Sequence, residues 1–185
     1  MKKIYPFLII LYSVSNPLLA TASTNLDGWG EFKFGMTTAQ VLEKTGPIIE
    51  KNNNSDGTPI VTWKALVLGQ NVDVIAFLPN DTLNGIKINF PVVRDGSPEE
   101  CFQRITNIVD ELSKKYGTPD EPLSRYGSGV GGNISWHAIF RFNNGAKITA
   151  DSGFTPASTF GLYQKPPECD YDVEYYSQRL PSKGL

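Results

Sequence analysis

The chain has 185 residues, of which 17 are basic and 19 acidic, and its 40% share of hydrophobic residues is enough to form a buried core. A mildly acidic protein lacks the basic surface with which proteins hold nucleic acids or anionic lipids. The single histidine cannot build a typical zinc site by itself. We therefore expect no nucleic-acid partner, no metal and no cofactor.

The N-terminus has the pattern of a secretory signal peptide. Lys2 and Lys3 precede an apolar run over 4–14, and the small residues Ala20-Thr21-Ala22 follow, so cleavage is expected after Ala22. The apolar run is too short to span a membrane. The sequence predicts one periplasmic or secreted domain over residues 23–185, with a frayed C-terminal tail, no membrane span and no lipid anchor. Without Lys2 and Lys3 it keeps 15 basic residues against 19 acidic ones.

The first predicted unit, residues 29–46, is a short strand, a tight turn and a short helix. Thr37 is the expected N-cap, and Gln40 completes a capping box with it. Gly35 suits the sharp turn before the helix. Gly46 is predicted to end the helix in a left-handed conformation, with Pro47 preventing its continuation.

This unit also carries a family resemblance. Phe34-Gly-Met-Thr-Thr-Ala-Gln-Val-Leu, followed by Gly46, resembles the FGMT-x-x-QVL-x-x-x-G element of the β-lactamase inhibitory proteins. It is also similar to an element of the BamE-type envelope proteins. The resemblance implies a small helical unit on an antiparallel sheet and no enzymatic activity. This chain carries the element once, whereas the inhibitors carry it twice, and it has no lipid-anchoring cysteine after the signal peptide.

The middle of the chain is predicted to form strands and a long helix. Residues 48–57 are mostly polar and are expected to form a loop. Three β-rich runs then follow, at 60–68, 72–78 and 83–90, with turns short enough for an antiparallel meander. A helix is expected from Pro98 to Tyr116, with Ser97 and Glu100 as its capping box and Gly117 at its end.

The remaining segments are predicted to be mainly strands. Residues 118–132 are expected to form a long loop, and an alternating strand over 134–142 leads into the hairpin turn at Asn143-Asn144-Gly145. Further strand-like runs follow, at 146–150, 152–158, 160–163 and 169–175. The predicted fold is therefore α+β, with two helices packed on one face of an antiparallel sheet and the helix-then-strands order occurring twice. One continuous sheet and two packed halves both remain open.

Cys101 and Cys169 are the two cysteines. In an oxidising compartment such a pair usually forms a disulfide, and closing a loop of about 70 residues would stabilise the fold by about 4 kcal/mol. The alternative is a reactive thiol or a redox pair. The lack of a C-x-x-C motif and the place of Cys101 on an apolar helix face favour the disulfide.

Two further segments are candidate sites, one of them rich in glycine and the other containing the histidine. The run Gly127–Gly132 matches G-x-G-x-x-G, but it leads into a strand, whereas a dinucleotide site requires a following helix. It is interpreted either as a flexible loop or as a recognition loop in which Arg125 and Tyr126 contact a partner. His137 and Ser135 share a strand face, but no acid lies near them in the sequence to orient the ring. His137 is interpreted as a surface or half-buried histidine.

The last strand carries an acidic face. Asp170, Asp172 and Glu174 alternate with inward-facing residues and so lie on one side. Simple solvation explains this pattern, and if the face is functional we expect it to meet a basic protein partner. The leading hypothesis is a non-catalytic exported protein that binds another protein, as an inhibitor, immunity protein or envelope accessory. The alternatives are a module that binds a small ligand or glycan between the helices and the sheet, and an enzyme whose groups converge only in space.

Overall fold

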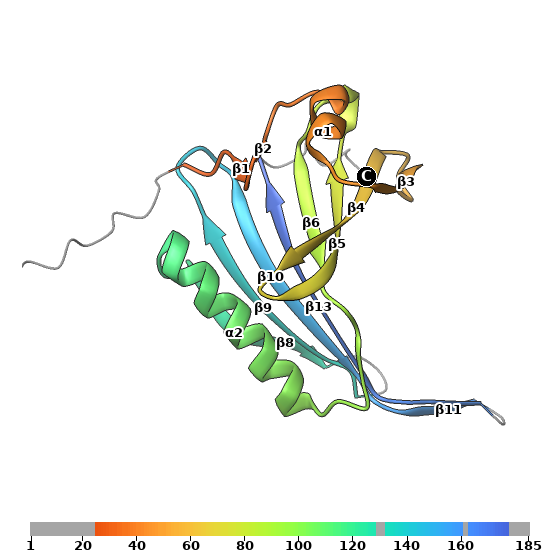
Figure 1. The fold of residues 1–185 in the computed structure, drawn as a ribbon. Helices are drawn as coiled ribbons and strands as arrows, with labels where there is room; N and C mark the ends of the chain where they lie inside the picture. Colours follow the sequence, from red (N-terminus) through yellow and green to blue (C-terminus); the bar gives the residue numbers. More distant parts are fainter. Residues whose placement is uncertain (1–24, 129–131, 161–162, 178–185) are drawn as a thin grey trace, which may run out of the picture.

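The structure, a computed structural model, describes residues 25–128, 132–160 and 163–177. The expected signal peptide and frayed tail lie outside these residues. The chain has an α+β fold, in which a long helix lies across a twisted antiparallel sheet and a short helix lies at one end of that sheet (Figure 1).

One continuous sheet forms the body of the molecule. Its strands run in the order β3 (Ile48–Asn53), β4 (Pro59–Val67), β5 (Gln70–Phe77), β6 (Gly85–Asn89), β13 (Glu168–Tyr176), β10 (Lys147–Thr155), β9 (Ile134–Arg141) and β8 (Glu121–Ser128). Every neighbouring pair is antiparallel. Strand β13 is the last of these in the sequence but lies in the middle of the sheet, where it joins the two halves. The open question of one sheet or two halves is thereby settled in favour of one sheet.

Several short elements complete the fold. β1 (Gly28–Trp29) pairs with β2 (Phe32–Lys33), and β7 (Val93–Arg94) pairs with the start of β13. β11 (Ser158–Phe160) and β12 (Tyr163–Lys165) form a hairpin that projects from the end of the sheet (Figure 1). A 3-10 turn, η1 (Pro79–Asp81), leads from β5 toward β6.

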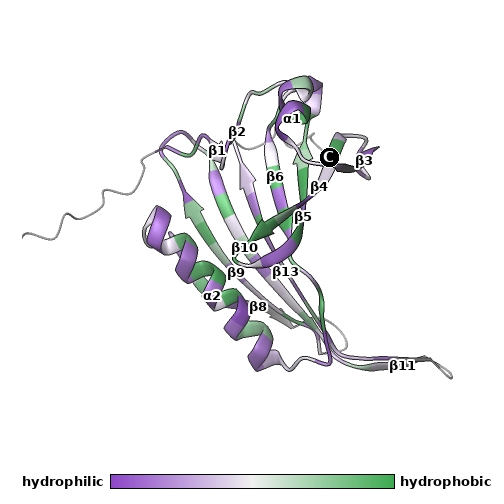
Figure 2. Cartoon of the chain, viewed as in Figure 1, coloured by the Kyte–Doolittle hydropathy of each residue, from purple (hydrophilic) through white to green (hydrophobic). Residues whose placement is uncertain are grey.

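Helix α2 (Pro98–Tyr116) begins at the predicted capping box. The Ser97 N–H donates to Glu100 Oε2 at 2.8 Å, and the Glu100 N–H donates to Ser97 Oγ at 3.2 Å. The helix packs on β10, β9 and β13, and its polar residues gather on the outer side (Figure 2). Its buried residues are Cys101, Ile105, Ile108, Val109 and Leu112. Gly117, with φ 87°, ends it as expected.

Helix α1 (Thr38–Lys44) also begins as predicted. The Thr37 N–H donates to Gln40 Oε1 at 2.9 Å, and the Gln40 N–H donates to Thr37 Oγ1 at 3.3 Å. The predicted left-handed stop at Gly46 is wrong. The cap is Thr45 in extended geometry, with φ −71° and ψ 144°, and Gly46 is not among the residues with positive φ. An extended ending suits the chain because β3 begins only four residues after the helix.

Two predicted loops are strands. β3 occupies most of the expected 48–57 loop, and β8 occupies most of the expected 118–132 loop. Both lie at edges of the sheet, where a strand has one partner and tolerates polar and charged residues. Their polar composition is therefore a property of edge strands, which the sequence pattern does not distinguish from a loop.

The disulfide between Cys101 and Cys169 is formed. The two Cα atoms are 5.6 Å apart, and both residues are fully buried. The bond joins the first turn of α2 to the start of β13. Within the described residues, no helix has the length and the apolar character that crossing a membrane requires.

Candidate functional site on the open face of the sheet

The two faces of the sheet have different environments. One face packs against α2 and contains the core, whereas neither described helix covers the other, which we call the open face (Figure 1). Strand pairing places the side chains of one row of residues on a common face. The main polar residues of the open face are Glu121, Tyr126, His137, Arg141, Lys147, Asp151, Asp170, Asp172, Glu174, Tyr176, Lys87, Asp73 and Lys64.

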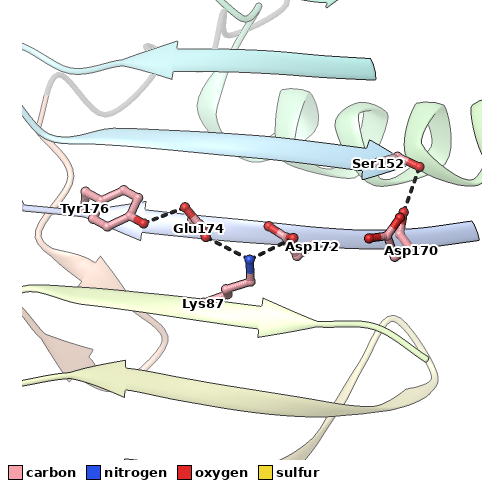
Figure 3. A network of polar contacts seen from close by, with 6 residues as sticks. All are labelled: Lys87, Ser152, Asp170, Asp172, Glu174 and Tyr176. Carbon is pink, nitrogen blue, oxygen red and sulfur yellow. Dashed lines mark hydrogen bonds and ion pairs between the residues drawn. The ribbon is translucent and has the colours of Figure 1, made fainter. Parts of the chain in front are cut away.

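A charged network lies at the centre of this face, between β6 and β13. Lys87 Nζ lies 2.9 Å from Asp172 Oδ2 and 3.0 Å from Glu174 Oε1 (Figure 3). The Tyr176 hydroxyl donates to Glu174 Oε2 at 2.5 Å. The side chains of Lys87, Asp172 and Glu174 are 27%, 24% and 21% exposed. The three side chains are therefore largely shielded from water, and their ion pairs connect β6 to β13.

Burial changes the protonation of the network. It raises the pKa of Asp172 to about 6, since the hydrogen bond from Lys87 offsets only part of the lost hydration and the nearby Glu174 and Asp151 add repulsion. Burial also raises the pKa of Asp151, although the neighbouring His137 acts in the opposite direction. The pKa of Lys87 is raised, because its bonds to the two carboxylates outweigh the effect of its burial.

Asp170 extends the acidic surface toward the start of β13. Its register partner on β10 is Gly153, and a Cβ atom at that glycine would lie 2.5 Å from Asp170 Oδ1. The glycine therefore makes room for the carboxylate to lie over β10. From the other side of the same strand, the Ser152 hydroxyl donates to the Asp170 backbone carbonyl at 3.0 Å (Figure 3).

His137 lies beside this surface with acids on both sides. Its Nδ1 is 3.8 Å from Asp151 Oδ1 and its Nε2 is 3.6 Å from Glu121 Oε2. The ring centroid of Tyr126 lies 4.7 Å from that of His137, and Arg141 pairs with Glu121. His137 is half-buried, as interpreted from the sequence. The acids beside the ring come from the neighbouring strands β8 and β10. They are not sequence neighbours of His137, so the sequence did not point to them.

The row Ser124, His137 and Asp151 has the residue types of a hydrolase triad, but its geometry differs from one. A triad requires a hydrogen bond between the nucleophile and the histidine. Among the described contacts, none joins Ser124 or Ser135 to the ring, and Nε2 faces a carboxylate. No group of acids, cysteines and histidine among the described residues is arranged to hold a metal ion. The arrangement is suited to binding through charge and hydrogen bonds.

The structure brings most of the sequence-predicted contact residues together. Asp170, Asp172, Glu174 and Tyr126 all lie on the open face. Arg125 does not join them, because it pairs with Trp136, whose side chain is in the core on the helix side of the sheet. Residues 129–131 of the glycine run lie outside the described residues. Sequence reasoning missed Lys87 and Asp151, whose only signal was their polar position in alternating strands.

Comparisons with protein-family models, with curated proteins and with solved structures find no match.

Proposed function

We propose that this chain is a non-catalytic exported protein that binds another protein through the open face, as an inhibitor, immunity protein or envelope accessory. The observation that carries the proposal is the charged network on a sheet face that neither described helix covers. Side chains that already pair with one another have less conformational freedom to lose on binding than unpaired ones, which favours association.

The charge of the open face indicates the chemistry of the partner. Four carboxylates, from Asp151, Asp170, Asp172 and Glu174, lie along β10 and β13, and Lys87 contacts two of them. The same face also carries Lys64, which pairs with Asp73, and Lys147, which lies over the Tyr176 ring. A partner that presents arginine or lysine side chains complements this surface and is attracted to it before contact. Tyr126, which is 49% exposed at the edge of the face, supplies an aromatic anchor of the kind that often dominates binding energy.

Two further observations support export and the class of function. A buried disulfide is characteristic of proteins that fold in an oxidising compartment, and the N-terminal pattern of the sequence agrees with that compartment. The resemblance of residues 34–46 to the β-lactamase inhibitory proteins and to the BamE-type proteins supports a binding role.

The test is an affinity pull-down from periplasmic extract, with the protein produced from its full 185-residue sequence and purified in the oxidised form. We expect one stoichiometric partner, identified by mass spectrometry, whose retention decreases as the salt concentration rises. The variant Asp170→Arg places a cation on the open face at an exposed position. It should weaken binding at least tenfold, since like charges at an interface cost several kcal/mol.

The matched control is Glu99→Arg. It makes the same charge reversal at an exposed position of α2, on the opposite side of the sheet. It should leave the affinity within twofold of the wild type. A pull-down without a stoichiometric partner, or equal losses in the two variants at unchanged thermal stability, would contradict the proposal.

A further inference from the structure

A second place in the molecule has the properties of a binding site, and it does not involve the open face. Between α2 and the β4–β5 hairpin lies a cavity of about 400 Å³, within the roughly 300–1,000 Å³ range of small-molecule sites. Figure 1 shows the tip of this hairpin bending toward the helix. Its apolar lining comprises Trp29, Val67, Leu68, Ile88, Phe90, Ile108, Leu112, Tyr116, Val173 and Tyr175.

The hairpin tip holds a leucine in an unfavourable conformation beside this cavity. Leu68 and Gly69 form a two-residue turn with φ 49° and 75°, a geometry for which asparagine and glycine are preferred. The Leu68 side chain is 52% exposed and lines the cavity. Local backbone strain together with an exposed apolar side chain indicates a role in binding, because neither stabilises the isolated fold.

The charges at the cavity favour an anionic group. Its charged lining residues are Glu111, Lys114 and Lys115. Glu111 and Lys114 form an ion pair with each other. Lys115 forms no ion pair with the described residues, and its Nζ lies 4.9 Å from the centroid of the Tyr116 ring. One net positive charge therefore lies beside an apolar cavity.

A polar hollow adjoins the apolar one. It shares Leu68, Ile108, Glu111 and Lys114 with the apolar cavity and adds the polar side chains of Gln70, Arg104, Asn107 and Asp110, so the charges that it adds cancel. The Tyr171 hydroxyl, which also lines it, donates to Gln70 Oε1 at 3.3 Å. Lys115 lines only the apolar cavity, so a carboxylate beside Lys115 lies outside this polar hollow.

We propose that this cleft binds a single-chain fatty acid, with its hydrocarbon chain between α2 and the β4–β5 hairpin and its carboxylate near Lys115. The apolar walls remove the chain from water, and the Lys115 ammonium group interacts with the carboxylate. No covalent step is involved. This site lies on the helix side of the sheet and is independent of partner binding on the open face.

Isothermal titration calorimetry with sodium dodecanoate, below its micelle-forming concentration, tests the proposal on the oxidised full-sequence protein. We expect saturable binding with one molecule per chain and weaker binding of dodecanol, which has the same chain and no charge. The variant Leu68→Asn removes one apolar wall and suits the turn conformation. It should weaken dodecanoate binding roughly tenfold without destabilising the fold.

Two further variants make the result specific. Leu66→Asn is the matched control, because Leu66, on β4 just before the turn, is 72% exposed and lines neither hollow. It should bind dodecanoate like the wild type. Lys115→Gln should reduce the affinity for dodecanoate to that for dodecanol.

Three outcomes would overturn the proposal. The first is no saturable binding of dodecanoate by the wild type. The second is an equal effect of Leu68→Asn and Leu66→Asn. The third is a dimer, seen by size-exclusion chromatography, that Leu68→Asn dissociates, because a second copy of the chain would then occupy the cleft.

Discussion

At the scale of single residues, the most informative group is Asp172. Its carboxylate hydrogen-bonds with Lys87, yet burial and two neighbouring acids still raise its pKa to about 6. Native Asp172 therefore holds its proton to a higher pH than the same residue in the unfolded chain. Between about pH 4 and pH 6 the native state binds more protons than the unfolded state, so stability falls as the pH rises through this window.

The variant Asp172→Asn removes this contribution. We expect the free energy of unfolding of the wild type to decrease by about 1–2 kcal/mol from pH 4 to pH 6 through this group, and the variant to show a flatter profile. Urea unfolding at a series of pH values measures it. Asp170→Asn removes a carboxylate from the same strand face and serves as the control. A slope lost equally in both variants would contradict the assignment to Asp172.

At the scale of elements, local signals in the sequence were sufficient for the starts of both helices and insufficient for the end of α1 and for the edge strands. Ser97 and Glu100 predicted the start of α2 because a capping box depends only on residues three positions apart. Asn144 and Gly145 predicted their hairpin for the same reason, and Gly145 has the expected positive φ of 79°. β3 and β8 were missed because their identity as strands depends on a partner strand.

The N-cap of α2 gives a prediction at this scale. Ser97→Ala removes the side-chain acceptor for the Glu100 N–H, and we expect a loss of about 1 kcal/mol in the free energy of unfolding. Chemical denaturation measures the loss. Ser113→Ala makes the same substitution in the interior of α2, where alanine is the better helix former, and should be neutral or slightly stabilising. Equal losses in the two variants would show that the cap contributes nothing.

At the scale of the whole molecule, pairing between strands far apart in the sequence determines which residues meet on the open face. The sequence alone did not predict that pairing. The place of β13 between β6 and β10 brings Lys87, Asp151 and Asp172 together from three distant segments. A one-residue shift in the register of β13 would move Asp170, Asp172 and Glu174 to the helix side. The acidic face of β13 was predictable from alternation, but its neighbours on the open face were not. A ligand site between the helices and the sheet was one of the alternatives, but its lining residues were not predicted.

The disulfide also acts at this scale, since it closes a loop between residues 68 positions apart in the sequence. The double variant Cys101→Ala/Cys169→Ala should lower the free energy of unfolding by about 4 kcal/mol, mainly by freeing the unfolded chain. Urea unfolding measures the change, and the wild type treated with a reducing agent should show a similar loss. A loss below about 1 kcal/mol would show that the core alone holds α2 on β13.

The central position of the last strand also determines the order of events during synthesis. Strands β6 and β10 are both complete before β13 is made, yet each needs β13 as a neighbour. Until residues 168–176 have left the ribosome, the nascent chain has two unfinished half-sheets with unpaired inner edges. The sheet therefore cannot close before β13 has been made, and until then two inner strand edges lack their partner and are open to pairing with other chains.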